Sequence, residues 1–371
     1  MTRLGRRRWL ALGGAALCCP EGLAAVPATS APGNGQEARF SDLPTLIVGG
    51  PENSALAPWA RMLGSAIGQR MLPTEQPLRI VHIGGADGVT AANQFEARTA
   101  PDGATALLIS GSTAVAWLMG DPRVQFDAGH WLPLATGLAS AVVVATQALT
   151  LFAPAGAMGN GPASAPTGRY RLSCSGPLDV AIAASLGLSM LGLETQAATT
   201  SDDPVAELRA GRADFALLQG AAVIDRLTFA RRTGDIPIFS LGATDEAGQN
   251  VRDPLIPDVP SLPELLSNGA PHTLSSLLPA WRAVAATAQI EFALVLPWLT
   301  PSGTVALWRK AVSQMALSAT PDVQASGPSK LGPKPAMRIH TDPAGNFGMS
   351  AMRPDANTLI ELRRWAALRN P

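Results

Sequence analysis

The chain of 371 residues is long enough for two ordinary domains, or for one domain interrupted by another. Hydrophobic residues make up 47% of it and charged residues 15%, which excludes a disordered chain and allows a large core. The formal net charge is zero, and it falls to −3 if residues 1–25 are removed as a leader. Because phosphate binding depends on clustered Lys and Arg, this weakly acidic chain is not expected to bind nucleic acid.

The N-terminus has the pattern of an export leader. Arginines at residues 6–8 precede an apolar run from Ala11 to Leu17, and small residues follow up to Ala24 and Ala25. Paired arginines before an aromatic residue and a leucine favour a twin-arginine signal. We therefore expect cleavage near Ala24 or Ala25 and a periplasmic protein. A general secretory signal that is rich in arginine is the alternative.

The cysteines raise a third possibility for the leader. Cys18 and Cys19 could accept a lipid, although Leu17 stands where a lipobox has a small residue. If both cysteines leave with the leader, Cys174 is the one that remains, and no intramolecular disulfide can form. Residues 26–40, which are rich in Pro, Ala, Ser and Gly over most of their length, then form a flexible tether to the folded part.

Short apolar runs that end at Gly, Ser or Pro alternate with helical patterns along the rest of the chain. We expect strands at Thr45–Val48, Leu78–Ile83, Ala106–Ile109, Ala141–Ala145, Arg169–Ser173, Ala213–Leu217, Ile236–Leu241 and Ile290–Leu296. Their Val, Ile and Leu content is typical of buried strands in a mostly parallel sheet. Strands that alternate with helices indicate α/β layers.

Two helix starts can be placed from the sequence. Pro58 is tolerated only in a first helical turn, so the first helix has its N-cap within residues 55–57, none of which is a good capping residue. Asp203 before Pro204 is a strong start, since Asp caps helices and proline suits the first position, and Gly211 is a plausible stop.

The loops that follow the strands are the expected ligand-binding region. Parallel α/β sheets bind ligands beyond the carboxyl ends of their strands, where helix N-termini offer unpaired N–H groups to anions. The candidate loops span residues 49–57, 84–88, 110–113, 173–179 and 199–203. Their polar residues are mostly Ser, Thr and Asn, which suit a small polar ligand. Ser and Thr are equally common as plain helix caps.

No reactive constellation of an enzyme is evident. The four histidines are scattered and lack metal-ligand spacing: His82, His130, His272 and His340. The run at residues 173–175 could offer a nucleophile, with His130 or His340 as its base, and Asp87 with Asp102 could form a carboxylate pair. However, Asp102 lies in a Pro-Asp-Gly turn sequence. We expect a non-enzymatic protein without metal or cofactor.

Several short motifs stand in a fixed order from about residue 45 to the end of the chain. They are a Gly-Ala turn at Gly85–Gly88, Pro101-Asp102-Gly103 before a Leu-rich strand, Ser175-Gly176, Glu207-Leu208 with Gly211–Asp214, and Asp258–Glu264. In this order they resemble the motifs of the substrate-binding proteins of tripartite tricarboxylate transporters, the TctC or Bug family. The resemblance implies the type II periplasmic-binding-protein fold, in which two α/β lobes joined by crossing strands close on a small carboxylate.

The resemblance also implies a domain plan and partners. Lobe 1 would cover residues 41–143 and lobe 2 residues 144–242, and residues 243–371 would return to lobe 1 and end in helices. The partners would be a small organic ligand, with a carboxylate expected, and the membrane permease subunits of the transporter, and the protein would be a monomer. The alternative is a divergent family member that acts as a periplasmic sensor or scaffold for another ligand or a partner protein.

The departures from the family pattern concentrate where the ligand should lie. Glu52, Asn53 and Ser54 stand where the family carries Pro-Gly-Gly, Ala57 replaces an Asp that could pair with an ammonium, and Ile182 replaces a His. Ser175 and Gly176 are retained, and they should lead into a helix with Asp179 as its N-cap. From the loops and the resemblance together, the candidate ligand-binding residues are Asn53, Ser54, Asp87, Ser110, Ser112, Ser173, Ser175, Gly176, Thr199, Thr200 and Gln219.

Overall fold

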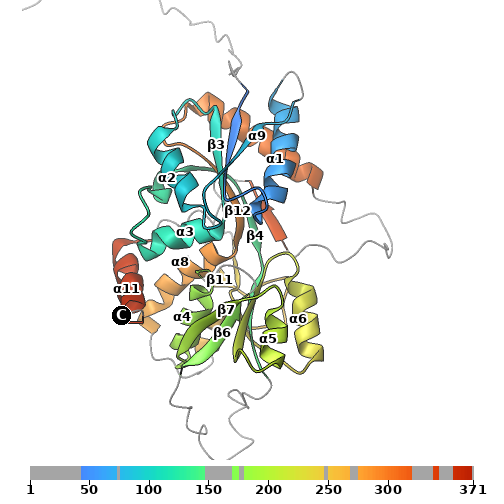
Figure 1. The fold of residues 1–371 in the computed structure, drawn as a ribbon, viewed down its shortest axis with the longest axis vertical. Helices are drawn as coiled ribbons and strands as arrows, with labels where there is room; N and C mark the ends of the chain where they lie inside the picture. Colours follow the sequence, from blue (N-terminus) through green and yellow to red (C-terminus); the bar gives the residue numbers. More distant parts are fainter. Residues whose placement is uncertain are drawn as a thin grey trace, which may run out of the picture. The chain divides into compact units, whose positions relative to one another are not determined.

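The computed structural model describes residues 43–72, 76–146, 169–174, 179–245, 250–267, 275–319, 337–341 and 354–369. The predicted leader and tether lie outside these ranges, and so do Ser175 and Gly176. The described residues belong to one compact unit, Ala38–Pro371, and none of their helices is long and apolar enough to cross a membrane. Figure 1 shows two sheets in this unit, each flanked by helices.

The first sheet has six strands in the order β13-β4-β12-β3-β1-β2. Their bounds are β1 Thr45–Gly49, β2 Arg79–Ile83, β3 Thr105–Ile109, β4 Leu132–Ala139, β12 Ile290–Leu296 and β13 Met337–His340. Four helices flank it: α1 Leu56–Met71, α2 Val89–Arg98, α3 Gly111–Met119 and α9 Ser302–Ala319. Side chains alternate between the faces of a strand, so β1 packs Leu46 and Val48 against α1 and α9, and Ile47 against α2 and α3.

The second sheet has five strands in the order β7-β6-β8-β5-β9. Their bounds are β5 Ala141–Ala145, β6 Tyr170–Cys174, β7 Thr195–Thr200, β8 Phe215–Gln219 and β9 Ile236–Ser240. Three helices belong to this part: α4 Ile182–Met190, α5 Pro204–Arg209 and α6 Val223–Arg232. Again both faces of the sheet are buried, with Val143 on the α4 side and Val142 and Val144 on the side of α5 and α6.

The remaining elements are short or join the two sheets. They are β10 Ala243–Thr244 paired with β11 Asn250–Val251, α7 Leu262–Ser267, α8 Leu278–Ala288, α11 Ala356–Ala367, and the 3-10 turns Ala128–His130 and Ser275–Leu277. Helix α8 contacts α3, α4 and α11, so it packs against helices that flank both sheets.

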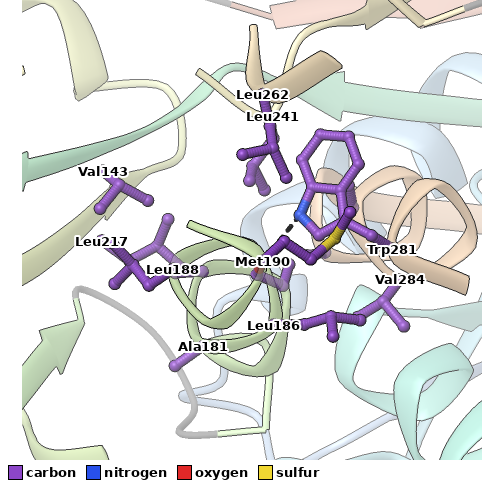
Figure 2. Close-up of a cluster of buried hydrophobic side chains, with 14 of the residues drawn as sticks. Val143, Ala181, Leu186, Leu188, Met190, Leu217, Leu241, Leu262, Trp281 and Val284 are labelled. Carbon is purple, nitrogen blue, oxygen red and sulfur yellow. Dashed lines mark hydrogen bonds between the residues drawn. The ribbon is translucent and has the colours of Figure 1, made fainter. Parts of the chain in front are cut away.

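The core between α4 and α8 is built around Trp281. Its side chain is fully buried, and the indole Nε1 donates a hydrogen bond of 3.0 Å to the carbonyl of Ala183 in α4. Figure 2 shows this bond and the aliphatic side chains around it. Gly187 faces the same cluster, where an added Cβ would lie 2.7 Å from Cζ of Phe239. Close packing of this kind leaves no room for even one more methyl group.

The chain crosses from the first sheet to the second at one residue. Strand β4 ends at Ala139, β5 begins at Ala141, and Ser140 lies between them with its side chain fully buried. The crossing is held by backbone hydrogen bonds of 2.9 Å on either side, from Ala139 N to the Gln289 carbonyl and from Leu241 N to the Ala141 carbonyl.

All eight strands predicted from apolar runs are present, but the prediction of mostly parallel sheets is wrong. Strand β12 is antiparallel to both β3 and β4, and β5 is antiparallel to both β8 and β9. Parallel pairing is confined to β1 with β2 and β3, and to β6 with β7 and β8. An apolar run reports that both faces of a strand are buried, and this holds for either direction of pairing.

Of the three helix starts predicted from the sequence, two are confirmed and one is wrong. Asp203 caps α5, its carboxylate accepting a 3.0 Å hydrogen bond from Ala206 N. Helix α1 has Ala55 as its N-cap without a side-chain bond, as Pro58 requires. The prediction for Asp179 is wrong, because α4 begins at Ile182 with Ala181 as its N-cap and Asp179 lies in the preceding turn.

Candidate ligand-binding site

A cavity of about 420 Å³ lies where loops from the two sheets meet. This volume is within the range of sites for small ligands. Its lining comes from the loops after β1, β2, β3 and β8, from Val180, and from the junction of α8 with β12: Gly49, Ser54, Ala55, Leu56, Ala86, Ser110, Gly111, Ser112, Val180, Gln219, Gly220, Ala221, Ala222, Arg226, Ala288, Ile290 and Glu291.

The β1–α1 loop brings the N-terminus of α1 to this cavity. A turn closed by the bond from Ser54 N to the Pro51 carbonyl, 2.9 Å, precedes the helix. The Ser54 hydroxyl is buried and has no hydrogen-bond partner within the described part of the chain. Ala55 supplies no capping side chain, and the first turn of α1 contains no acidic residue. Ala57 N donates a hydrogen bond of 3.0 Å to the Ser54 carbonyl and Pro58 has no N–H, so within the described residues the N–H of Leu56 is the one in the first turn left for a ligand.

The β3–α3 loop contributes a second helix N-terminus. Ser110 is the N-cap of α3, yet its side chain makes no capping bond, and its buried hydroxyl has no partner among the described residues. Gly111 follows at a close backbone approach, since a Cβ there would lie 2.3 Å from the carbonyl oxygen of Thr287. A glycine is required at this position, and it fixes the start of α3 against the end of α8.

The β8–α6 loop brings a third helix N-terminus, that of α6, to the cavity. Gly220 has a φ of +90°, a conformation that side chains other than glycine rarely adopt, and it turns the chain from Gln219 into α6. Ala222 is the N-cap of α6 and supplies no side-chain bond. Arg226, one turn into the helix, donates long hydrogen bonds of 3.4 Å to the carbonyls of Gln219 and Asp202.

The N-termini of α1 and α3, which have no acidic residue in their first turns, contribute positive potential to the cavity, whereas the first turn of α6 also carries Asp225. Helix N-termini carry unpaired N–H groups and the positive end of the helix dipole, which attract carboxylates and other anions. The hydroxyls of Ser54 and Ser110, which have no partner among the described residues, add two donors. Two charged side chains also line the cavity, Arg226 and Glu291. Burial raises the pKa of Glu291, and the positive charge of Arg226 opposes that rise.

Asp179 lies next to the cavity wall. Burial raises the pKa of its carboxyl group, hydrogen bonds from backbone N–H groups and the Ser112 side chain act in the opposite direction, and the charge of Asp87 adds to the rise. Its neighbour Val180 lines the cavity.

The structure brings four of the predicted site residues together. Ser54, Ser110, Ser112 and Gln219 all line the cavity. They lie at the carboxyl ends of strands β1, β3 and β8 or just beyond them, so their meeting depends on the strand order of both sheets.

The other predicted residues lie in different surroundings. Asn53 is exposed on the loop before α1. Asp87 forms an ion pair of 2.6 Å with Arg123 and accepts a hydrogen bond of 3.2 Å from Val89 N at the start of α2. Ser173 is fully buried in β6, Thr199 pairs with it across the sheet, and Thr200 is exposed at the end of β7. For Ser175 and Gly176, which lie outside the described residues, ligand binding stays a prediction.

Sequence reasoning missed both charged residues of the cavity. Arg226 lies on an ordinary amphipathic helix, and nothing in its local sequence distinguishes it. Glu291 did leave a signal, because it is the single charged residue in the apolar strand Ile290–Leu296. An acid in a buried strand costs free energy unless it has a partner or a function.

No protein-family model and no curated protein matches the sequence, whereas solved structures match its fold. A TctC solute-binding protein from Polaromonas, solved without ligand, aligns with a TM-score of 0.57 at 16% identity, covering 87% of this chain and 97% of that one. A protein described as a periplasmic transporter aligns with a TM-score of 0.51 at 15% identity, covering 88% and 97%. At such identities the likeness concerns the fold. The chain therefore has the two-lobed α/β fold of periplasmic solute-binding proteins of the TctC type, as its motifs imply.

Proposed function

We propose that the protein is an exported solute-binding receptor of the TctC or Bug family, which binds a small carboxylate in the cavity between its two sheets. One observation carries the proposal. The N-termini of α1, α3 and α6, whose N-cap residues make no side-chain capping bond, meet at one cavity, which is also lined by Ser54 and Ser110, and the buried hydroxyls of these serines have no hydrogen-bond partner within the described part of the chain.

A carboxylate would satisfy these groups. Buried hydroxyl and N–H groups without partners cost free energy, and an anion that accepts their hydrogen bonds removes this cost. The lobes contribute unequally, since α1 and α3 belong to the first sheet and α6 to the second. A ligand held by both would join them, as expected of a receptor that closes on its solute.

The same site supports a receptor rather than an enzyme. Recognition of a carboxylate needs donors and positive potential, which the cavity lining offers. A reaction would further need a nucleophile beside a base. The two titratable side chains of the lining, Arg226 and Glu291, do not make such a pair.

The proposed cellular role rests on the predicted leader and on the family resemblance. Arginines at residues 6–8 before an apolar run support export to the periplasm. There the receptor would deliver its ligand to the permease subunits of a tripartite tricarboxylate-type transporter.

Calorimetric titration of the mature protein with mono-, di- and tricarboxylates tests the function. We expect saturable binding of at least one carboxylate with one site per chain, without added metal. An uncharged sugar of similar size serves as the comparison and is expected not to bind. Saturable binding of the sugar and of no carboxylate would refute the proposal.

A further inference from the structure

Among the described residues, Glu291 is the one acidic side chain that lines the cavity. Three helix N-termini and Arg226 favour negative charge in the ligand, yet this carboxyl group lines the same space. Within the part of the chain that the structure describes, Glu291 forms no hydrogen bond and no ion pair; Arg226 acts on it only through its charge. A carboxylate in such a position repels a second carboxylate and attracts a positively charged group.

The backbone directs Glu291 to its place. The register of β12 against β4 shifts between Ile290 and Phe292, so Glu291 occupies a bulge and has no partner residue in β4. Ile290 and Phe292 on either side are buried in the core of the first sheet. Bulges recur next to binding sites, where they re-aim a side chain out of the ordinary alternation of a strand.

The facing loop leaves room for the carboxyl group. Oε1 of Glu291 lies 3.0 Å from the position that a Cβ on Gly220 would occupy. A side chain at residue 220 would therefore cover one oxygen of the carboxylate. With glycine there, Glu291 of the first sheet reaches the loop that enters α6, at the point where both lobes contribute to the cavity.

Resting on the proposed function, we propose that the ligand is a small amino acid, whose carboxylate binds at the N-termini of α1 and α3 with Ser54 and Ser110 and whose ammonium group binds Glu291. The arrangement places donors at one part of the cavity and an acceptor at another. It also gives the chain a partner for an ammonium group, although Ala57 has replaced the acidic residue expected in the first loop.

The alternative ligand is a dicarboxylate that meets Glu291 in its protonated form. In that case the Glu291 carboxyl group would donate a hydrogen bond to the second carboxylate, and an amide at this position could donate as well. Glu291→Gln, which retains the size of the side chain and removes its charge, therefore separates the two ligand classes: binding of an amino acid weakens, whereas binding of a dicarboxylate is retained.

The test is a set of acids of matched length, titrated into the mature protein by calorimetry. 4-Aminobutyrate, pentanoate and glutarate differ only in ending with an ammonium, a methyl or a carboxylate group. Longer and shorter sets of this kind, and α-amino acids with their des-amino acids, extend the comparison. In at least one set we expect the amino acid to bind more tightly than its methyl-ended and dicarboxylate counterparts, by about tenfold or more.

Substitution of Glu291 tests whether this residue causes the preference for the amino acid. Glu291→Gln is expected to weaken binding of the preferred amino acid by about ten- to hundredfold and to leave the methyl-ended acid unchanged. Glu361→Gln, the same change at an exposed position on α11, is the control and should alter neither.

The outcomes separate this inference from the proposed function. Tightest binding by a dicarboxylate, with Glu291→Gln as strong as the native protein, would overturn the ammonium assignment and leave the carboxylate receptor intact. If no acid of any set binds, the proposed function fails as well. The preference among ligands is measured on the native protein, so it decides the question even if Glu291→Gln does not fold.

Discussion

The hydroxyl of Ser110 offers the most direct test of the site at the scale of one residue. It is buried, lines the cavity and has no partner among the described residues. Ser110→Ala should weaken carboxylate binding by about 1.5–3 kcal/mol, the usual contribution of a hydrogen bond to a charged group. Ser302→Ala, at an exposed serine of α9, should leave the affinity unchanged. Calorimetric titration measures both, and equal affinities of the two variants would place the carboxylate elsewhere.

Glu291 should make the stability of the ligand-free protein depend on pH. Burial raises the pKa of Glu291 in the folded state, so the folded protein holds this proton more tightly than the unfolded chain does. The contribution of Glu291 to stability is thus present below its unfolded pKa and is lost as the pH rises through the folded pKa.

Glu291→Gln should remove this dependence. We expect the ligand-free variant to melt at a higher temperature than the native protein at neutral pH, with the difference disappearing in acid. Thermal melts across a pH series measure the effect, and Glu361→Gln should follow the native protein throughout. A lower melting temperature of Glu291→Gln at neutral pH would show that the ionised carboxylate is stabilised by its surroundings. Residues that bind ligands often lower stability in this way.

At the scale of elements, the contact between α4 and α8 predicts a difference between two similar glycines. A Cβ at Gly187 would lie 2.7 Å from Cζ of Phe239 and 3.0 Å from Nε1 of Trp281, whereas a Cβ at Gly303 in α9 meets nothing within 4 Å. Gly187→Ala should destabilise the protein by about 1–3 kcal/mol through overpacking. Gly303→Ala should be neutral or stabilising by up to about 1 kcal/mol, because alanine favours helices. Chemical denaturation compares them, and similar effects would contradict this packing.

The elements also show what sequence patterns can and cannot predict. Apolar runs located β5 and β12 with their observed bounds, because burial of both faces leaves a continuous signal. The edge strands β7 and β13 were not predicted, since β7 is polar and β13 is a run of four residues that pairs with a strand far away in the sequence. The internal strand β4 was not predicted either, because Pro133, Thr136 and Gly137 interrupt its apolar run. The direction of strand pairing was not predicted correctly, because it depends on the connections between strands, which a local sequence pattern does not contain.

The candidate site was predictable in part, for a related reason. Ser54 and Ser110 follow strands β1 and β3, whose carboxyl ends meet at one edge of a parallel pair, and this placed them together. Arg226 and Glu291 enter the cavity from a helix and from an antiparallel strand. Their positions depend on the assembled fold, and the family resemblance drew attention to other loops.

At the scale of the whole molecule, the predicted leader makes the export route of the protein testable. Twin-arginine recognition does not accept replacement of both arginines by lysine, so Arg6→Lys with Arg7→Lys should abolish appearance in the periplasm. Cell fractionation followed by immunoblotting measures it. The same double change in a leader of the general secretory type has little effect, so normal export of the variant would assign the protein to that route.

The close approach at Gly111 has a consequence for any attempt to change the ligand by engineering. A Cβ there would lie 2.3 Å from the Thr287 carbonyl oxygen and 2.9 Å from that of Ile290, so the start of α3 rests directly on the backbone that leads into Glu291. Ser110 and Glu291 thus flank one shared backbone contact, and neither element can shift without the other. The spacing between the hydroxyl and the carboxylate is therefore set by side-chain length. A variant that accepts a longer ligand should arise by shortening residue 291, as in Glu291→Asp, and seldom by changes in the loops.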